Sequence, residues 1–403
     1  MSSTSGLIEA VPLRNRCGTY DSFQPRSNDH LFVNNVRFLS MASVIAVHCI
    51  GSVVGLVDGN SFDLFARSLA QPFKFGTIGF FLISGFLMGE GISRRTPLEY
   101  LTRRLQTVLM PWLAWVSLCW ILSIAHHRAP GELRLYSLGS EVPLALDKLR
   151  SCLLGTSYWF VPNLLLALCV LLLCRSFIDD LRLGLVLMMA SLFYGLNIYA
   201  RWIPLSGHTE ALFGFVFYLW LGAWVARHFA RFETWMAGVP LRVFAILAVL
   251  TLLPAILESQ VMSAEGIEDN LNTLRLSNQL YSVTMVLAMF KIRTAIWPRK
   301  LNVRATTFGI YLSHAIVLSV VTILARWILL KAGVSGTWRA APGWLACLSL
   351  GMFAAIYGTS LGLTTLLLKF PRLRWLVGAF PINRGYPASL DGATSVEMIS
   401  LNR

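Results

Sequence analysis

Apolar stretches long enough to cross a bilayer recur along nearly the whole chain, and this constrains the fold more than any other feature. Of the 403 residues, 56% are hydrophobic and only 13% are charged, whereas a soluble domain carries about 25% charged residues. The pattern predicts an all-α fold, a polytopic membrane helix bundle with about ten transmembrane helices. We expect the spans near 36–57, 72–92, 106–125, 153–174, 183–199, 210–226, 243–257, 276–290, 306–330 and 343–368.

The basic residues indicate the orientation of these spans. They lie in short clusters between apolar stretches, with about 21 Lys and Arg on one side and about 9 on the other. Both termini are therefore expected in the cytoplasm, and we predict a multi-pass protein of the cell (inner or plasma) membrane. The net charge of +14 is explained by this asymmetry, so we expect no nucleic-acid partner. The expected organisation is a cytoplasmic tail over 1–35, a transmembrane domain over 36–368 and a cytoplasmic tail over 369–403.

The seven cysteines are scattered, mostly through apolar spans, and form no CxxC pair. We interpret them as small apolar packing residues, and we predict neither a metal site nor a disulfide framework.

Two strongly polar side chains, Arg37 and His48, interrupt the first apolar run. They are eleven residues apart, which on a helix returns to within about 20° of the starting direction and spans about 16 Å. Ionisable residues within a membrane helix are costly and mark functional sites by default. Arginine suits an anion such as phosphate, and a neutral imidazole is a good general base near pH 7.

Other polar residues have both a structural and a functional interpretation. Ser84 and His314 are expected at a depth similar to His48, where they either line a cavity or mediate close helix packing and interhelical hydrogen bonding. The aromatic pair Tyr158 and Trp159, followed by Asn163, forms either an interfacial belt or a platform for a sugar ring. Arg103 and Arg104 are adequately explained as an orientation signal.

Five stretches together resemble the membrane-bound acyltransferase-3 family. They are Arg37-x10-His48, GTIGFFLISGFLM (76–88), YLTRRLQTVLMPW (100–112), YWFVPNLLL (158–166) and FGIYLSHAIVL (308–318). Each motif is weak alone, but five in the family's order across about 36–320 are specific. The count of about ten spans also agrees with that family.

The resemblance implies an enzyme that transfers an acyl group, commonly acetyl, from cytoplasmic acyl-CoA to a hydroxyl of an extracytoplasmic carbohydrate or lipid-linked glycan. His48 would be catalytic, with Ser84 or His314 as candidate oxyanion donors, and Arg37, Arg103 and Arg104 would bind the CoA phosphates. One departure is Thr107, where many members carry a second basic residue. Acyl-CoA is expected as donor substrate and the bilayer as environment.

Two alternatives to acyl transfer remain open at this point. A secondary transporter would use Arg37, His48 and His314 as an anion or proton path. A non-catalytic scaffold would retain only the fold. The acceptor, the choice between acetyl and a larger acyl group such as succinyl, an acyl-histidine intermediate and the oligomeric state are not specified by these residues.

Overall fold

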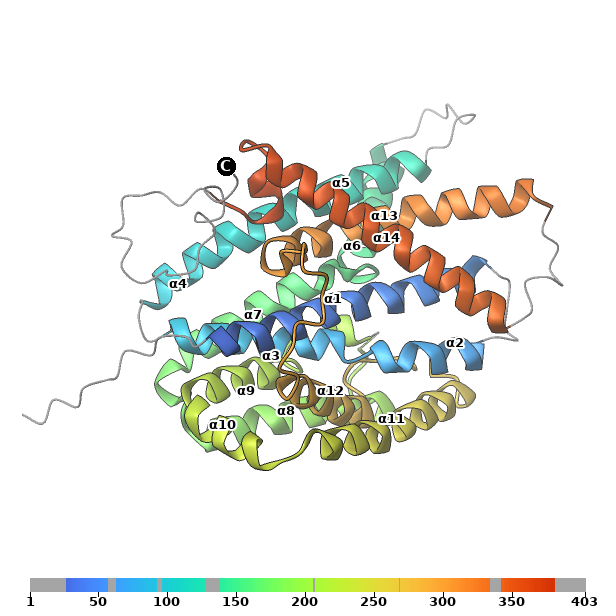
Figure 1. Cartoon of the computed structure of the whole chain (residues 1–403). Coiled ribbons are helices and arrows are strands. Elements are labelled where there is room, and N and C mark those ends of the chain that lie inside the picture. Colours follow the sequence, from blue (N-terminus) through green and yellow to red (C-terminus); the bar gives the residue numbers. More distant parts are fainter. Residues whose placement is uncertain are drawn as a thin grey trace, which may run out of the picture.

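The computed structural model describes residues 27–56, 63–92, 96–127, 138–205, 207–267, 269–333 and 342–380. All regular elements in these ranges are helical. The helices are α1 (Ser27–Leu56), α2 (Asp63–Ala70), α3 (Gly76–Gly91), α4 (Pro97–Arg104), α5 (Met110–His127), α6 (Leu138–Leu154), α7 (Phe160–Leu173), α8 (Leu181–Ala200), α9 (Val216–Arg227), α10 (Phe229–Gly238), α11 (Leu241–Ala264), α12 (Leu276–Phe290), α13 (Val303–Lys331) and α14 (Pro342–Lys369). Figure 1 shows most of the long helices running in a common direction, with α1 near the middle, where it packs against α3, α13 and α14.

Fewer helices are long enough to cross a membrane unaided than the sequence pattern predicts. Within the described residues, seven helical stretches are long and apolar enough to cross a membrane, and an eighth is obtained if Val142–Leu154 and Ser157–Leu173, which are bent by 71°, form one span. The predicted spans at 210–226 and 276–290 correspond to α9 with 12 residues and α12 with 15. A straight helix needs about 20 residues to cross the hydrocarbon core. Hydropathy cannot distinguish such a short buried helix from a span.

Three predicted polar loops contain helices. The loop after the first span holds α2, which joins α3 through the short 3-10 turn Gln71–Phe73, so Leu64–Gly89 forms one candidate span that starts earlier than the sequence pattern predicts. The basic loop at 93–105 contains α4, and the loop at 126–150 contains α6. These helices were missed because their sequences are polar enough to be taken for loops.

Helix α4 has clear local reasons to begin where it does. The Thr96 side chain accepts a hydrogen bond from the Glu99 backbone N–H at 3.3 Å, and the Glu99 carboxylate accepts one from the Thr96 N–H at 3.1 Å. This reciprocal capping box is followed by Pro97, whose fixed φ suits the first turn. A π-helical segment, Leu105–Leu109, then joins α4 to α5. Arg103 and Arg104 therefore lie on one continuous helical stretch, Pro97–His126, instead of in a loop.

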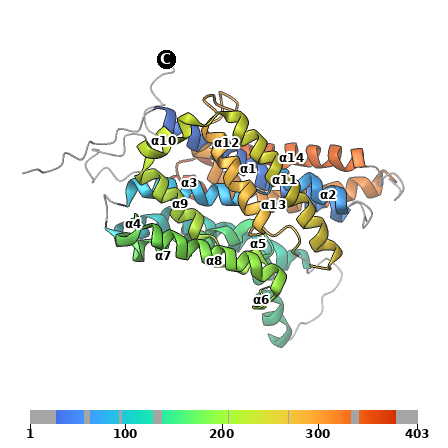
Figure 2. The same cartoon turned by 90° about the horizontal axis from the view of Figure 1, so that it is seen from below.

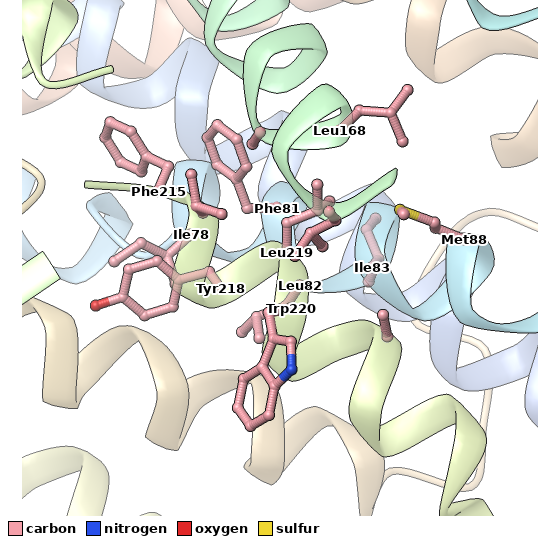
Figure 3. Packing of buried hydrophobic residues seen from close by; sticks show 14 of the residues in the cluster. Ile78, Phe81, Leu82, Ile83, Met88, Leu168, Phe215, Tyr218, Leu219 and Trp220 are labelled. Atoms are coloured by element: carbon pink, nitrogen blue, oxygen red, sulfur yellow. The ribbon is translucent and has the colours of Figure 1, made fainter. Parts of the chain in front are cut away.

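Glycines bring α3 and α9 into backbone contact. A Cβ added at Gly85 would lie 1.9 Å from the Leu219 carbonyl oxygen, and one at Gly222 would lie 2.0 Å from that of Leu82. Close approach through small residues is a common way to pack helices in membranes. Large side chains then surround the contact; Figure 3 shows Phe81, Leu219 and their neighbours packed around it. Figure 2 shows the same two helices side by side. This pair holds α3 in a fixed position beside α1.

Candidate active site

A cavity of about 290 Å³ opens between α1, α3, α4, α7 and α13. Its apolar wall comes mainly from α3 and α7, and Ser84 contributes a hydroxyl to it. The α13 side is formed by Thr307, Phe308 and Tyr311. Gly378, in the turn after α14, also lines the cavity, with φ of 76°. The chain beyond the last long helix thus helps to close the site.

Three arginines line one cavity: Arg37 from α1, Arg104 from α4 and Arg304 from the first turn of α13. The Arg37 guanidinium donates to the Asn34 side-chain oxygen at 3.0 Å. Arg104 donates to the Tyr100 hydroxyl through Nε at 3.3 Å and Nη2 at 3.0 Å. The charges of Arg104 and Arg304 both act on Arg37. Three like charges around one hollow are suited to a polyanion such as the phosphates of a nucleotide.

The structure separates the two adjacent arginines of the sequence motif. Arg104 faces the cavity, whereas Arg103 is exposed and is not among the lining residues. Thr107 lies in the π-helical segment, also lines the cavity, and donates its hydroxyl hydrogen bond to the Arg103 carbonyl at 2.9 Å. Arg304 was missed by sequence reasoning because it ends a basic segment that is fully explained as an orientation signal. The only available hint was its position at the start of the late helix that carries His314.

His48 and His314 meet across the interface between α1 and α13. Their ring centroids are 5.8 Å apart, and the planes are inclined by 44°. Tyr311, which lines the cavity, has its ring centroid 5.9 Å from that of His314. Within the described part of the chain, the His48 ring has no hydrogen bond. The two histidines that the sequence places at similar depth are therefore neighbours, and Tyr311 connects them to the cavity wall, which neither histidine lines itself.

The hydrogen bonds of His314 define which nitrogen carries its proton. Nδ1 lies 2.6 Å from the Tyr311 carbonyl oxygen and 3.2 Å from that of Ile310. A carbonyl can only accept, so Nδ1 donates, and in the neutral ring Nε2 keeps a free lone pair. Nε2 is buried and has no partner among the described residues. An orphaned buried acceptor beside a second histidine indicates a place where a proton can be received.

The predicted aromatic platform is not supported. Tyr158 is fully buried, and its hydroxyl donates to the Leu312 carbonyl at 2.8 Å. Trp159 is only 8% exposed and packs edge-on against His208, with ring centroids 5.0 Å apart. Both rings are inside the protein because their apolar surface and polar tips find partners there. Tyr158 instead fixes α13 at the turn before His314.

Asn163 is also buried, yet it is only partly satisfied. Its amide nitrogen donates to the Thr209 carbonyl at 3.1 Å, and its side-chain oxygen has no partner in the described ranges. These ranges contain no group of three His, Cys, Asp or Glu side chains arranged to hold a metal ion.

Comparison with known proteins identifies the family. A family model described as an acyltransferase domain, of the acyltransferase-3 type, matches residues 30–361. The match covers α1 to most of α14, including Arg37, His48, Arg104 and His314. Comparison with curated proteins and with solved structures finds no match. The chain is therefore a multi-pass membrane acyltransferase that belongs to the acyltransferase-3 family.

Proposed function

We propose that this acyltransferase moves an acyl group, acetyl in the simplest case, from cytoplasmic acyl-CoA to a hydroxyl of an extracytoplasmic carbohydrate or lipid-linked glycan. The observation that carries the proposal is the placement of two functional groups on one helix. Arg37 lines the arginine-rich cavity, and eleven residues further along α1 His48 lies against His314. An elongated donor with an anionic end and a reactive end fits this arrangement.

The proposed topology has ten membrane passes, with α9 and α12 counted as short ones, and both termini in the cytoplasm of a cell-membrane protein. Support comes from the arginine cavity. Arg37, Arg104, Arg304 and Gly378 all belong to segments that the charge asymmetry assigns to the cytoplasmic side, and they line one cavity. A cytoplasmic nucleotide could reach these residues directly.

Donor binding follows from charge and length. The CoA phosphates would be held by Arg37, Arg104 and Arg304. The pantetheine arm would then extend along the apolar wall over the distance of about 16 Å that separates Arg37 from His48 on a helix. This places the thioester carbonyl beside the two histidines.

In the chemical step, the acceptor hydroxyl attacks the thioester carbonyl while His48 takes its proton. A C–O bond forms and the C–S bond breaks, and the leaving CoA thiolate takes up the proton from the His48 imidazolium. The free Nε2 of His314 would accept a hydrogen bond from His48 or from the acceptor and orient it. Ser84 is our candidate donor to the oxyanion, because it lines the donor cavity. We favour this direct transfer over an acyl-histidine intermediate, which would be trapped as a labelled enzyme.

The test uses purified full-length protein in nanodiscs, with acetyl-CoA binding and slow acetyl-CoA hydrolysis measured together. We expect His48→Ala to bind acetyl-CoA as the wild type does but to lose turnover by a factor of at least about 10². His126→Ala is the matched control, because His126 is exposed at the end of α5. Normal turnover by the His48 variant would exclude His48 as the catalytic base.

The transporter alternative is disfavoured by the family assignment. It predicts substrate flux across a vesicle membrane without consumption of acyl-CoA. We expect no such flux, and the same preparations would detect it.

A further inference from the structure

A second polar cluster lies on the side of His48 away from the arginine cavity. It comprises Lys74, in the break between α2 and α3; His208, in the turn before α9; and Asp269, in the segment before α12. Helix α3 runs from this cluster, starting two residues after Lys74, to Ser84 and Met88 in the cavity wall.

The start of α3 packs on α1, because a Cβ added at Gly76 would lie 3.2 Å from the Ser43 Cβ and 3.2 Å from a Val44 methyl carbon. Val44 is about one helical turn before His48, and Lys74 is two residues before Gly76, so Lys74 lies close to the part of α1 that carries His48. The charges of Lys74 and His208 also act on His48.

Asp269 is a fixed anion that orients His208. Its Oδ2 accepts from the His208 backbone N–H at 3.0 Å, from the Asn272 amide at 2.8 Å, and lies 3.0 Å from His208 Nδ1. Burial alone would raise the pKa of Asp269. The charge and hydrogen bonds of His208, together with the Lys74 charge, outweigh this effect and hold that pKa well below its ordinary range. The ionised carboxylate therefore keeps the proton of His208 on Nδ1 and directs Nε2 away from Asp269.

Lys74 differs from Arg275, a second cation of this region, because no described residue makes a hydrogen bond or a close ion pair with its ammonium group. Arg275 is fully buried, donates to the Gln71 side-chain oxygen and the Ala255 carbonyl at 2.8 Å each, and lies 3.6 Å from Glu258. Within the part of the chain that the structure describes, the Lys74 ammonium makes no hydrogen bond and has no carboxylate within 4.0 Å, although the charge of Asp269 acts on it from farther away. A partly buried ammonium is normally paired.

Two neutral atoms beside the cluster are also unsatisfied. The Gln71 side-chain nitrogen, three residues before Lys74, is buried and has no partner among the described residues. The Asn163 side-chain oxygen also has no partner there, while the Asn163 amide nitrogen donates a hydrogen bond to the carbonyl of Thr209, the residue after His208. A cation, an oriented imidazole, a free amide donor and a free amide acceptor thus gather near His48. Such a set can recognise a sugar bearing a negative charge.

We propose that Lys74 and His208 form a subsite for a substrate carboxylate next to the acylated position, as in a uronic acid residue of the acceptor, and that the Asn163 side-chain oxygen accepts from a hydroxyl of the same sugar. The inference rests on the proposed function, because it assumes that the acceptor approaches from this side. The same chemistry would hold the free carboxylate of a dicarboxylic donor such as succinyl-CoA. An acceptor carboxylate and a donor carboxylate can be distinguished by substituting Lys74. The protein would lose its preference for an acidic acceptor in the first case and for succinyl-CoA in the second.

The acceptor arm compares trigalacturonate with its methyl ester, which has the same rings without the charges. Binding to the full-length protein in nanodiscs is measured for the wild type, Lys74→Gln and Lys331→Gln. Lys331 is the control because it is an exposed lysine at the end of α13. We expect wild type and Lys331→Gln to bind the acid at least tenfold more tightly than the ester. Lys74→Gln should lose this preference while binding the ester as before, and Lys74→Arg should restore it.

The donor arm compares hydrolysis of succinyl-CoA with that of acetyl-CoA in the same preparations. A tenfold fall in the succinyl-to-acetyl ratio of hydrolysis rates in Lys74→Gln, with no such fall in Lys331→Gln, assigns the carboxylate to the donor. The subsite is refuted if the wild type prefers neither the acid over the ester nor succinyl-CoA over acetyl-CoA. It is also refuted if Lys74→Gln changes the charged and uncharged ligands alike. If the wild type did not hydrolyse acetyl-CoA at all, the proposed function would be contradicted. The binding measurements with trigalacturonate and its ester would still test whether Lys74 holds a carboxylate.

Discussion

At the scale of single residues, His314 illustrates how a backbone contact can prepare a side chain for chemistry. Its Nδ1 donates to backbone carbonyls of its own helix, so Nε2 is left as a buried acceptor. No described residue donates a hydrogen bond to Nε2. Leaving such an atom unsatisfied costs about 1–3 kcal/mol, which is tolerated most readily where a substrate supplies the missing partner.

We therefore expect His314→Ala to lower kcat for acetyl-CoA hydrolysis by about 10²-fold or more while leaving the KM nearly unchanged. Ser313→Ala is the control, because the neighbouring hydroxyl donates only within α13, to the Gly309 carbonyl at 2.9 Å. Steady-state kinetics on both variants separates the two parameters. Equal losses in the two variants would mean that this part of α13 is merely sensitive to packing.

Arg304 is a second single residue with a testable role, and it lies with Arg37 and Arg104 in the lining of the cavity. The resemblance leads us to expect a second basic residue at Thr107, and both Thr107 and Arg304 line the cavity. We infer that Arg304 supplies the cationic charge that Thr107 lacks.

Arg304→Ala should raise the KM for acyl-CoA by about tenfold or more, because a hydrogen bond to a charged group contributes about 1.5–3 kcal/mol. Adding Thr107→Arg to that variant should recover most of the loss. Arg231→Ala, at an exposed position on α10, controls for the general loss of charge. If the KM of the double variant stayed as high as that of Arg304→Ala, a basic residue at position 107 could not replace Arg304, and the inference would be wrong.

At the scale of elements, the contact of α3 with α9 determines where the α3 side of the cavity wall lies. The glycines make this contact possible, since their backbones approach to distances that no side chain could occupy. Gly358 in α14 is different, because a Cβ there would meet nothing within 4 Å.

Gly85→Ala should destabilise the protein by about 1–3 kcal/mol or more, since the added methyl must push α3 away from α9. Gly358→Ala should be neutral or stabilising by up to about 1 kcal/mol, as alanine is the better helix former. Thermal unfolding in the same detergent compares them. Unchanged stability of the Gly85 variant would show that α3 and α9 can separate freely.

At the scale of the whole molecule, the proposed orientation places α10 and the end of α13 on opposite sides of the membrane. In a variant with all native cysteines replaced, Arg231→Cys should be labelled by an impermeant thiol reagent only after the cytoplasmic side is opened. Lys331→Cys should be labelled in intact cells. Both residues are exposed, so accessibility of the side chain is not limiting. Labelling of both from one side would overturn the topology.

The sequence anticipates the parts of this architecture that depend on local periodicity. The Arg37–His48 spacing indicates one face of a helix, and the structure has both residues on α1. Hydropathy locates each of the seven stretches that are long and apolar enough to cross a membrane. It cannot anticipate Arg304 beside Arg37, or the burial of Tyr158, because these depend on which helices pack together. Helix α2 and the helical Arg103–Arg104 segment were also missed, since polar helices resemble loops in composition.

One consequence follows from the uninterrupted course of α1 between Arg37 and His48. A helix is stiff along its axis, so the distance between Arg37, the proposed phosphate-binding residue, and His48, the proposed base, is constant at about 16 Å. The protein can thus act as a length gauge for its donor. A thioester on a shorter arm would still satisfy the arginines, yet its carbonyl would stop short of the histidines. The protein would therefore select donors by the length of the arm that carries the thioester, whatever the identity of the acyl group.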